Sequence, residues 1–372
     1  MRIAIDVSPL YMSVSGISNY IRNLLRGLAV VGGEHTFILY TNKPIRVEPP
    51  LPENFVVRLV RLPFHKFQIW FQLGLPFRFH LDGADVFLGS FHRLPLFSSI
   101  PSVLTIHDLS GLVLKDYHLR SVVIRNRFIP LFVRKARRII AISHFTKDET
   151  TRIFPRAENK VDVIPLAPAP GLSSEKDSVL LNKVRNSLSL PERYILFLGT
   201  LEPRKNLPRL LEAFASIANR VPQDLVLAGM MGWMSGPLQN LLKREDIHGR
   251  VHLTGPVDEA QLPALLTMAE LMVYPSLYEG FGLPVVESMA CKTPVLTSSA
   301  ASLPETAGGA ALLADPESVE DIAEKLFELA TDSNLRVELA EKGLARVSKL
   351  SWEQTALMTL NTCRQAFDGS FK

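Results

Sequence analysis

The sequence predicts an α/β protein made of two doubly wound domains, each built around a parallel sheet. Short apolar segments rich in β-branched residues alternate with longer amphipathic segments along the chain, which is typical of parallel strands covered by helices on both faces. A proline-rich break at 165–171 (PLAPAPG) separates two sets of such segments. The length of 372 residues also suits two domains.

The first set of segments begins at the N-terminus. Strands are expected at 2–7, 36–40, 56–60, 86–89, 103–107, 139–142 and 161–166, with helices over 17–31 and 122–135. After the break, strands are expected at 194–199, 225–229, 251–255, 271–274, 294–297 and 311–313, with helices over 207–220, 259–269 and 319–331. We therefore predict a first domain over 1–168, a linker over 169–190, a second domain over 191–350 and a last helix over 351–372.

Composition excludes several classes of protein. Hydrophobic residues make up 47% of the chain and charged residues 21%, which argues against disorder. The two cysteines, Cys291 and Cys363, do not form a disulfide framework or a zinc-type spacing. The N-terminal MRIAIDVSPLY reads as a strand and not as a signal peptide, and no apolar run approaches the roughly 20 residues of a membrane span. We therefore expect a cytoplasmic protein.

The stretch Glu279–Glu287 (EGFGLPVVE) is the strongest candidate for a ligand site. It follows an expected strand, and Pro284 suits the first turn of a helix that starts at Leu283. Free N–H groups and the positive end of the helix dipole would attract a phosphate there, and the two glycines would let it approach the backbone. The two carboxylates suit sugar hydroxyls. An ordinary helix cap with two surface acids is the alternative.

A second candidate segment is Gly199–Asn206 (GTLEPRKN), which joins the strand 194–199 to the next helix. Arg204 and Lys205 would lie at the same edge of the sheet as Glu279, where they could neutralise a diphosphate. A solvated basic turn is the alternative. No Asp-x-Asp motif and no cluster of metal ligands occurs, so no metal and no cofactor is expected beyond the donor substrate.

Together these segments resemble glycosyltransferase family 4 (group 1), the retaining enzymes of the GT-B fold. The resemblance implies two Rossmann-like domains facing a central cleft, with a C-terminal helix that crosses back to the first domain. Its Glu-x7-Glu signature matches Glu279, which would bind the transferred sugar, and Glu287, which would bind the ribose. The phosphate-binding lysine matches Lys205. Thr200 stands where the family often has arginine, so Arg204 becomes the candidate second cation.

The resemblance extends to the first half of the chain. Gly16 lies in a segment (DVSPLYMSVSGISNY) like the family's first glycine loop, which would face the diphosphate, and His107 lies at the end of an expected strand, which would point toward the sugar. Asp108 and Ser143 are expected to cap turns or helices, and Trp352 to pack. The implied catalytic residues are His107, Glu279, Arg204 and Lys205. The implied donor-binding residues are Gly16, Thr200, Arg204, Lys205, Glu279, Gly280, Phe281, Gly282, Leu283 and Glu287.

Charge is distributed unevenly along the chain. Residues 1–170 contain 22 basic and 12 acidic residues, whereas residues 171–372 contain 19 and 25. The segment 120–138 carries seven basic residues interleaved with apolar ones and no acid, and 64–81 upstream is rich in aromatics. Such a surface could lie on anionic lipid or hold a lipid-linked acceptor. A solvated helix face is the alternative, and no recognition motif supports nucleic acid.

We therefore expect a retaining hexosyltransferase, peripheral on the inner face of the cytoplasmic membrane. It would move a hexose, with mannose preferred, from a nucleotide sugar to a hydroxyl of a glycan or lipid-linked acceptor during cell-surface polysaccharide biosynthesis. The Glu-Pro-Arg-Lys-Asn form, which resembles mannosyltransferase-like members, makes GDP-mannose the first choice of donor and a UDP-hexose the second. The alternatives are a GT-B epimerase or phosphorylase, a non-catalytic nucleotide-sugar-binding protein and, last, an oxidoreductase, for which no Gly-x-Gly-x-x-Gly follows either first strand.

Overall fold

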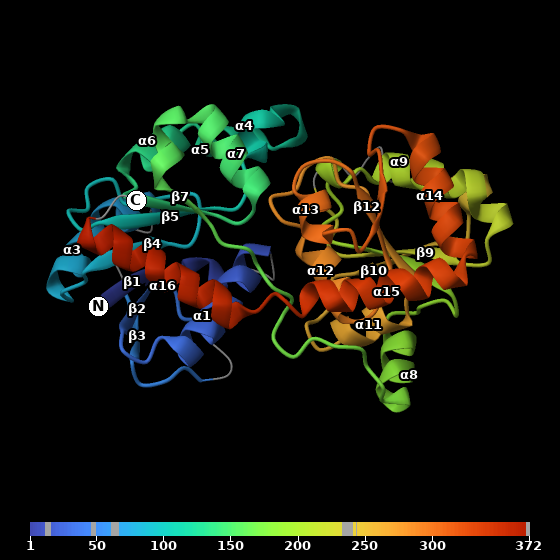
Figure 1. Ribbon diagram of the computed structural model, residues 1–372, viewed down its shortest axis with the longest axis horizontal. Helices are drawn as coiled ribbons and strands as arrows, with labels where there is room; N and C mark the ends of the chain where they lie inside the picture. The colour runs from blue at the N-terminus through green and yellow to red at the C-terminus, as the bar shows by residue number, and fades with distance from the viewer. Residues whose placement is uncertain (12–15, 46–49, 61–66, 233–240, 243, 370–372) are drawn as a thin grey trace. The chain divides into compact units, whose positions relative to one another are not determined.

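A computed structural model describes residues 1–11, 16–45, 50–60, 67–232, 241–242 and 244–369 (Figure 1). The chain forms two compact units: 1–167 together with 351–372, and 168–350. Each unit has one sheet with helices on both faces, as the alternation of apolar strands and amphipathic helices predicts. The second unit is therefore inserted between two parts of the first.

The first unit contains a seven-stranded sheet in the order β3-β2-β1-β4-β5-β6-β7, and its strands all pair in parallel. The strands are β1 (Arg2–Asp6), β2 (Thr36–Thr41), β3 (Phe55–Leu59), β4 (Val86–Gly89), β5 (Ser102–Ile106), β6 (Arg138–Ala141) and β7 (Val161–Val163). The helices are α1 (Gly16–Val31), α2 (Phe67–Ile69), α3 (Leu75–Leu81), α4 (Ser110–Val113), α5 (Arg120–Asn126), α6 (Ile129–Lys135), α7 (His144–Ile153) and α16 (Trp352–Asp368).

The second unit contains a six-stranded sheet in the order β10-β9-β8-β11-β12-β13, again parallel. The strands are β8 (Tyr194–Leu198), β9 (Asp224–Ala228), β10 (Val251–Gly255), β11 (Leu271–Tyr274), β12 (Val295–Ser298) and β13 (Leu312–Ala314). The helices are α8 (Ser178–Ser187), α9 (Leu207–Ile217), α11 (Leu262–Met268), α12 (Leu283–Ala290), α13 (Leu303–Ala307), α14 (Val319–Thr331) and α15 (Ser333–Val347).

Each sheet reverses its strand order once, between β1 and β4 in the first unit and between β8 and β11 in the second. In doubly wound sheets, ligands bind outside the carboxyl ends of the strands at this switch point. The two segments singled out in the sequence, 199–206 and 279–287, follow β8 and β11. The topology therefore places both of them at the switch point of the second sheet.

Two sequence-based predictions need correction. Residues 169–190, predicted as a linker, belong to the second unit; they contain α8, whose first turn is capped by Asp177, and Ser174 Oγ donates to the carbonyl of Cys291 at 2.7 Å. The helix predicted over 122–135 is two helices, because Pro130 lies in the first turn of α6 and cannot donate to the preceding turn.

The last helix, α16, packs along α1 of the first unit (Figure 1). Gly27 of α1 permits this contact, because a Cβ there would lie 2.8 Å from the carbonyl carbon of Trp352. Trp352 is buried, with its ring 6.0 Å from that of Tyr20. The predicted return of the last helix to the first domain is thus observed, with Trp352 in a packing role.

Candidate functional site

Glu279 lies at the centre of a buried group of charges in the second unit. Its Oε1 accepts a hydrogen bond from Lys205 Nζ at 2.6 Å, and Arg204 Nη1 lies 3.0 Å from the same oxygen. Arg204 Nε also pairs with Glu202 at 2.6 Å. Two carboxylates and two cations therefore balance each other, which is the condition under which charges tolerate burial. The sequence predicted Arg204, Lys205 and Glu279 as partners of a ligand, and the structure brings all three together.

Tyr274, the last residue of β11, joins the same group. Lys205 Nζ donates to the Tyr274 hydroxyl, which in turn donates to Glu279 Oε1 at 3.1 Å. Tyr274 and Glu202 were not predicted from the sequence as part of the site. The available signal was their position, because Tyr274 ends a strand at the switch point and Glu202 stands in the loop beside Lys205.

The ionisation of this group follows from its burial and its pairing. Burial alone would raise the pKa of Glu279, but the charges of Arg204 and Lys205 outweigh it and hold that pKa below its ordinary value. Burial, followed by the charge of Arg204, lowers the pKa of Lys205. Burial and the charge of Glu279 raise the pKa of Tyr274 well above its ordinary value. Tyr274 is therefore a neutral hydroxyl between an ammonium and a carboxylate.

Backbone geometry fixes the loops that carry these side chains. Asn206 has a positive φ of 64°, and its Nδ2 donates to the carbonyls of Pro275 at 3.1 Å and Pro316 at 2.6 Å. The amide of Leu277 donates to the carbonyl of Arg204 at 2.9 Å. These bonds tie the loop after β8 to the loop after β11. Asparagine tolerates this backbone region better than most residues, which explains its place after Lys205.

The start of α12 is packed against α13. Gly282 has a φ of 96°, and a Cβ there would lie 2.6 Å from Leu303 Cδ2. Ser302 Oγ donates to the carbonyl of Glu279 at 2.9 Å, and the Thr306 hydroxyl donates to that of Phe281. Gly280 and Phe281 are buried and Leu283 is half-buried.

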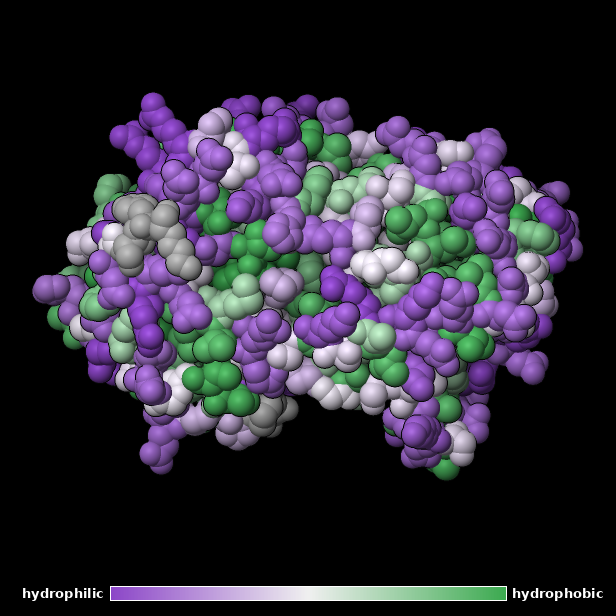
Figure 2. Space-filling model, viewed as in Figure 1, coloured by the Kyte–Doolittle hydropathy of each residue, from purple (hydrophilic) through white to green (hydrophobic). Residues whose placement is uncertain are grey.

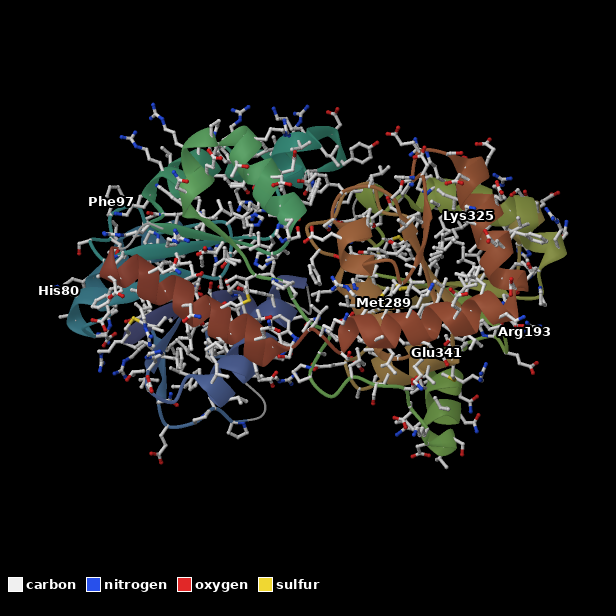
Figure 3. All side chains as sticks on the ribbon, viewed as in Figure 1. His80, Phe97, Arg193, Met289, Lys325 and Glu341 are labelled. Atoms are coloured by element: carbon white, nitrogen blue, oxygen red, sulfur yellow. The ribbon has the colours of Figure 1, made fainter. Side chains whose placement is uncertain are left out.

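Further along α12, Met289 packs on Gly343 of α15, where a Cβ would lie 2.9 Å from Met289 Cγ (Figure 3).

Glu287 lies within α12 and is also buried. Burial, reinforced by the charge of Glu259, raises the pKa of Glu287 to about 7. Within the described residues, no hydrogen bond or ion pair reaches its carboxylate. A buried carboxyl group with a pKa near neutrality is a frequent mark of a functional site. The two signature glutamates therefore differ, since Glu279 is ionised and paired whereas Glu287 titrates near pH 7.

Three adjacent strands of this sheet are followed by, or end in, a glycine with positive φ. These glycines are Gly199 after β8 (147°), Gly229 after β9 (144°) and Gly255 at the end of β10 (71°). A Cβ on Gly229 would lie only 2.0 Å from the carbonyl oxygen of Gly199. Thr200 follows the first of them and is half-buried. This edge of the sheet therefore offers backbone, and few side chains, to a ligand.

In the first unit, His107 follows β5 and is held by the loop after β4. Its Nε2 lies 2.9 Å from the carbonyl of Ser90, and its amide donates to His92 Nε2 at 2.7 Å. Burial lowers the pKa of His107, and that of His92 to about 4. His107 is therefore neutral, with Nε2 protonated toward Ser90 and Nδ1 left as an acceptor. His92 was not predicted from the sequence, although it also follows a buried strand.

The switch point of the first sheet carries an ion pair that the sequence analysis also missed. Asp6, buried at the end of β1, accepts from Arg93 Nη2 at 3.1 Å and from the amide of Ser8 at 2.9 Å. The Ser90 hydroxyl donates to the carbonyl of Asp6 at 2.6 Å. The 90–93 segment thus ties the end of β1 to His107.

The other residues predicted in this unit have mixed roles. Gly16 begins α1 and is exposed, with no heavy atom within 4 Å of an added Cβ. The same helix brings Tyr20 to His107, at 4.6 Å between ring centroids. Asp108 accepts from the amide of Ser110 at 3.0 Å, and Ser143 caps α7, as expected of capping residues. Gly16 and His107 belong to the first unit and the charged group to the second, so their meeting across a cleft stays a prediction.

Across the ranges that the structure covers, no helix is long and apolar enough to cross a membrane. No group of three histidine, cysteine or acidic side chains in the same ranges is placed to hold a metal ion.

Comparisons with known proteins agree with this geometry. The family model "Glycosyltransferase Family 4" matches residues 14–167, and the model "Glycosyl transferases group 1" matches residues 181–346. The chain is 28% identical to O-antigen chain mannosyltransferase B of Escherichia coli over 97% of this chain and 99% of that protein. It is 29% identical to the serotype-specific mannosyltransferase WbdA of Escherichia coli over 70% of this chain but only 33% of that protein.

The fold itself is found in solved structures. Sucrose-phosphate synthase from Thermosynechococcus elongatus superposes over all of both chains with a TM-score of 0.78 at 22% identity. One assignment accounts for these observations. The chain has two parallel α/β units, its last helix returns to the first unit, and the charged group lies at the switch point of the second sheet. Two family models together span most of the chain. The chain belongs to the group 1, family 4 glycosyltransferases and is a hexosyltransferase of the GT-B fold.

Proposed function

We propose that this glycosyltransferase moves mannose from a nucleotide sugar to a hydroxyl of a glycan or lipid-linked acceptor, with retention at the anomeric carbon, during the synthesis of cell-surface polysaccharide. GDP-mannose is the preferred donor and a UDP-hexose the second choice. The similarity to an O-antigen chain mannosyltransferase along nearly the whole chain supports the sugar and the pathway. The observation that carries the proposal is the convergence of Glu279, Arg204 and Lys205 at the switch point of the second sheet.

The charged group indicates how the donor would be held. Arg204 and Lys205 both direct their charges at Glu279. A diphosphate would take over these two cations, because phosphate oxygens offer charge-assisted hydrogen bonds of the same kind. Glu279 would then be released to accept hydrogen bonds from the hydroxyls of the sugar. The cations would stabilise the charge that develops on the departing diphosphate.

This exchange needs no catalytic metal, and metal independence is part of the proposal. Arg204, Lys205 and the amide-bearing start of α12 supply the positive charge that a divalent ion provides in other transferases. In the first unit, His107 would accept a hydroxyl hydrogen of the sugar at Nδ1. Donor turnover is expected to persist in excess chelator, and complete loss that added Mg²⁺ restores would contradict this part of the proposal.

The test is a panel of GDP- and UDP-sugars, assayed for binding by thermal shift and for release of nucleoside diphosphate with a lipid extract as acceptor. Glu279→Ala and Lys205→Ala are each expected to lower turnover at least a hundredfold, since charge-stabilising groups contribute about that much. Glu338→Ala and Lys342→Ala on the exposed face of α15 are the matched controls. Full activity in both site variants would refute the assignment of the site.

The same panel separates the alternatives. A GT-B epimerase or phosphorylase would turn over donor without any acceptor, and a non-catalytic binding protein would bind donor and release no nucleoside diphosphate. If the protein binds none of the GDP- or UDP-sugars, the main proposal is refuted. The whole-chain similarity to a mannosyltransferase supports transfer over these alternatives.

A further inference from the structure

We propose that the first unit binds the surface of an anionic lipid bilayer through a docking face made of the helical stretch 67–81, the loop 94–98 and helices α5 and α6. The proposal deepens the proposed function, because a lipid-linked acceptor would be presented at such a surface. The partner is a bilayer with negatively charged headgroups. It rests on exposed apolar side chains, unpaired arginines and the bonds that join the three segments.

The helical stretch 67–81 carries apolar residues on both of its faces. Trp70, Phe71, Leu75 and Phe79 are buried in the core. Leu73, Phe77 and Leu81, spaced by four residues, are exposed, Phe77 by 65%. Side chains four residues apart share one face of a helix, and on a solvated helix that outer face is normally polar. The exposed stripe therefore has an unfavourable contact with water that a lipid surface would remove.

The loop 94–98 joins this stripe to α6. Gln72 Nε2 donates to the carbonyl of Leu94 at 3.1 Å and Gln72 Oε1 accepts from the amide of Leu96 at 2.8 Å. Lys135 Nζ donates to the carbonyl of Ser98 at 2.6 Å. Phe97, between these anchors, is 73% exposed and projects from the edge of the unit (Figure 3). A rigidly held loop with an exposed phenylalanine at its tip suits insertion among headgroups.

Helices α5 and α6 contribute the charge. Arg120, Arg125, Arg127, Arg134 and Arg137 are exposed, and none of them pairs with an acid in the described part of the chain. No Asp or Glu occurs between Asp116 and Asp148. Exposed apolar residues, including Phe128 at 51%, stand among these arginines. Figure 2 shows hydrophilic side chains projecting over α5 and α6, with hydrophobic atoms visible among them.

One residue of the basic segment does not belong to this face. Arg138 is buried in β6 and pairs with Asp162, so its charge is already compensated. The remaining arginines are long, exposed and of one sign. Interleaved apolar and basic residues at a helical surface fit an anionic bilayer, where apolar side chains reach the acyl boundary and guanidinium groups meet the headgroups.

The test uses the full chain and vesicle flotation. Vesicles of phosphatidylcholine are compared with vesicles in which about one third is phosphatidylglycerol, at low and at high salt. The wild-type chain is expected to float with the anionic vesicles at low salt and to lose binding as salt rises, because the interaction is screened. Equal binding to both vesicle types, or no binding to either, would overturn the proposal.

Paired variants locate the face. Phe77→Ser with Phe97→Ser is expected to weaken vesicle partitioning at least tenfold, because the variant lacks two apolar side chains that would be transferred from water into the bilayer. Arg125→Gln with Arg134→Gln is expected to weaken it about twenty-fivefold at low salt, roughly fivefold for each arginine. The controls in the second unit are Val179→Ser with Val337→Ser, two exposed apolar positions, and Lys325→Gln with Lys342→Gln. Docking variants that float like the controls would refute the face.

Two further measurements keep the result interpretable. Donor binding and the thermal transition are measured on the same variants and should match wild type, since none of these residues lies in the charged group around Glu279. A wild-type chain that floats but binds no nucleotide sugar would contradict the proposed function and leave the docking face standing. Self-association of the wild-type chain that Phe77→Ser with Phe97→Ser abolishes, without vesicle binding, would assign the face to a second copy instead.

Discussion

Glu287 is buried without a partner in the described residues, and its pKa lies at about 7. The ionised carboxylate accepts ribose hydroxyl hydrogens through both of its oxygens, whereas the protonated acid turns one of these acceptors into a donor. Donor binding should therefore tighten about tenfold between pH 6 and pH 8, following the ionised fraction. Calorimetric titration with an intact nucleotide sugar, whose diphosphate does not titrate in this range, measures the effect.

Glu287→Gln provides the control for that prediction. It should remove the pH dependence of donor binding, and a slope that persists in the variant would contradict the role of Glu287. Because folding raises the pKa of this carboxyl group, its ionisation costs stability as pH rises from the ordinary value toward 7. The variant should therefore gain on the order of 3 kcal/mol in unfolding free energy at pH 8 and little at pH 5.

Tyr274 acts through Lys205 and Glu279 and is a positioning residue. Tyr274→Phe removes the hydroxyl that accepts from one and donates to the other. A loss of about 1–2 kcal/mol of transition-state stabilisation is expected, seen as a roughly tenfold fall in kcat with little change in KM. Tyr194→Phe is the matched control, because its hydroxyl bonds the carbonyl of Leu265 away from the site. Equal kinetic losses in both variants would contradict a positioning role.

At this scale the sequence predicted residue types better than side-chain partners. Glu279 and Lys205 could be found because a glycine-rich helix start and a basic loop each follow a buried strand. That Arg204 would bridge Glu202 and Glu279 could not be found, because the direction of a side chain depends on tertiary packing. Tyr274 and His92 were missed for the same reason, since each looks in the sequence like an ordinary core or loop residue.

At the scale of elements, the contact between α1 and α16 depends on one small residue. Gly27→Val would place side-chain carbons against the backbone of Trp352, where a Cβ already comes within 2.8 Å of the carbonyl carbon. Overpacking of this kind typically costs about 1–3 kcal/mol. A denaturant titration followed by tryptophan fluorescence should show that loss. Gly33→Val, at a position with open space around the added Cβ, should lose much less.

Strands and helix starts were predictable because their signals are local. All the expected strands occur, with ends shifted by a few residues. The error over 169–190 arose because proline content was taken as a sign of a linker, whereas the capping signal of Asp177 and the contact of Ser174 with Cys291 decide otherwise. The error at 122–135 arose because amphipathic spacing continued through Pro130.

At the scale of the whole molecule, the stability of the first unit should depend on residues far along the chain. A chain ending at Leu350 lacks α16. It therefore exposes Tyr20 and the face of α1, containing Gly27, on which α16 packs. Its first unit should unfold at a lower temperature, while the second unit, which has its own sheet and core, should keep its transition and its binding of nucleoside diphosphate. Differential scanning calorimetry with and without GDP measures both, and equal destabilisation of both units would contradict the division.

The insertion of one unit within the other also sets an order of events at the ribosome. Residues 1–167 emerge first but lack their final helix, which is made only after the whole of 168–350. At bacterial or eukaryotic synthesis rates of about 5–20 residues per second, this wait lasts on the order of ten to forty seconds. The unit that emerges second can complete its fold before the one that emerges first. During that interval the face of α1 that Trp352 and the rest of α16 will cover is accessible to chaperones, and a nascent chain stalled before residue 351 should be bound by them.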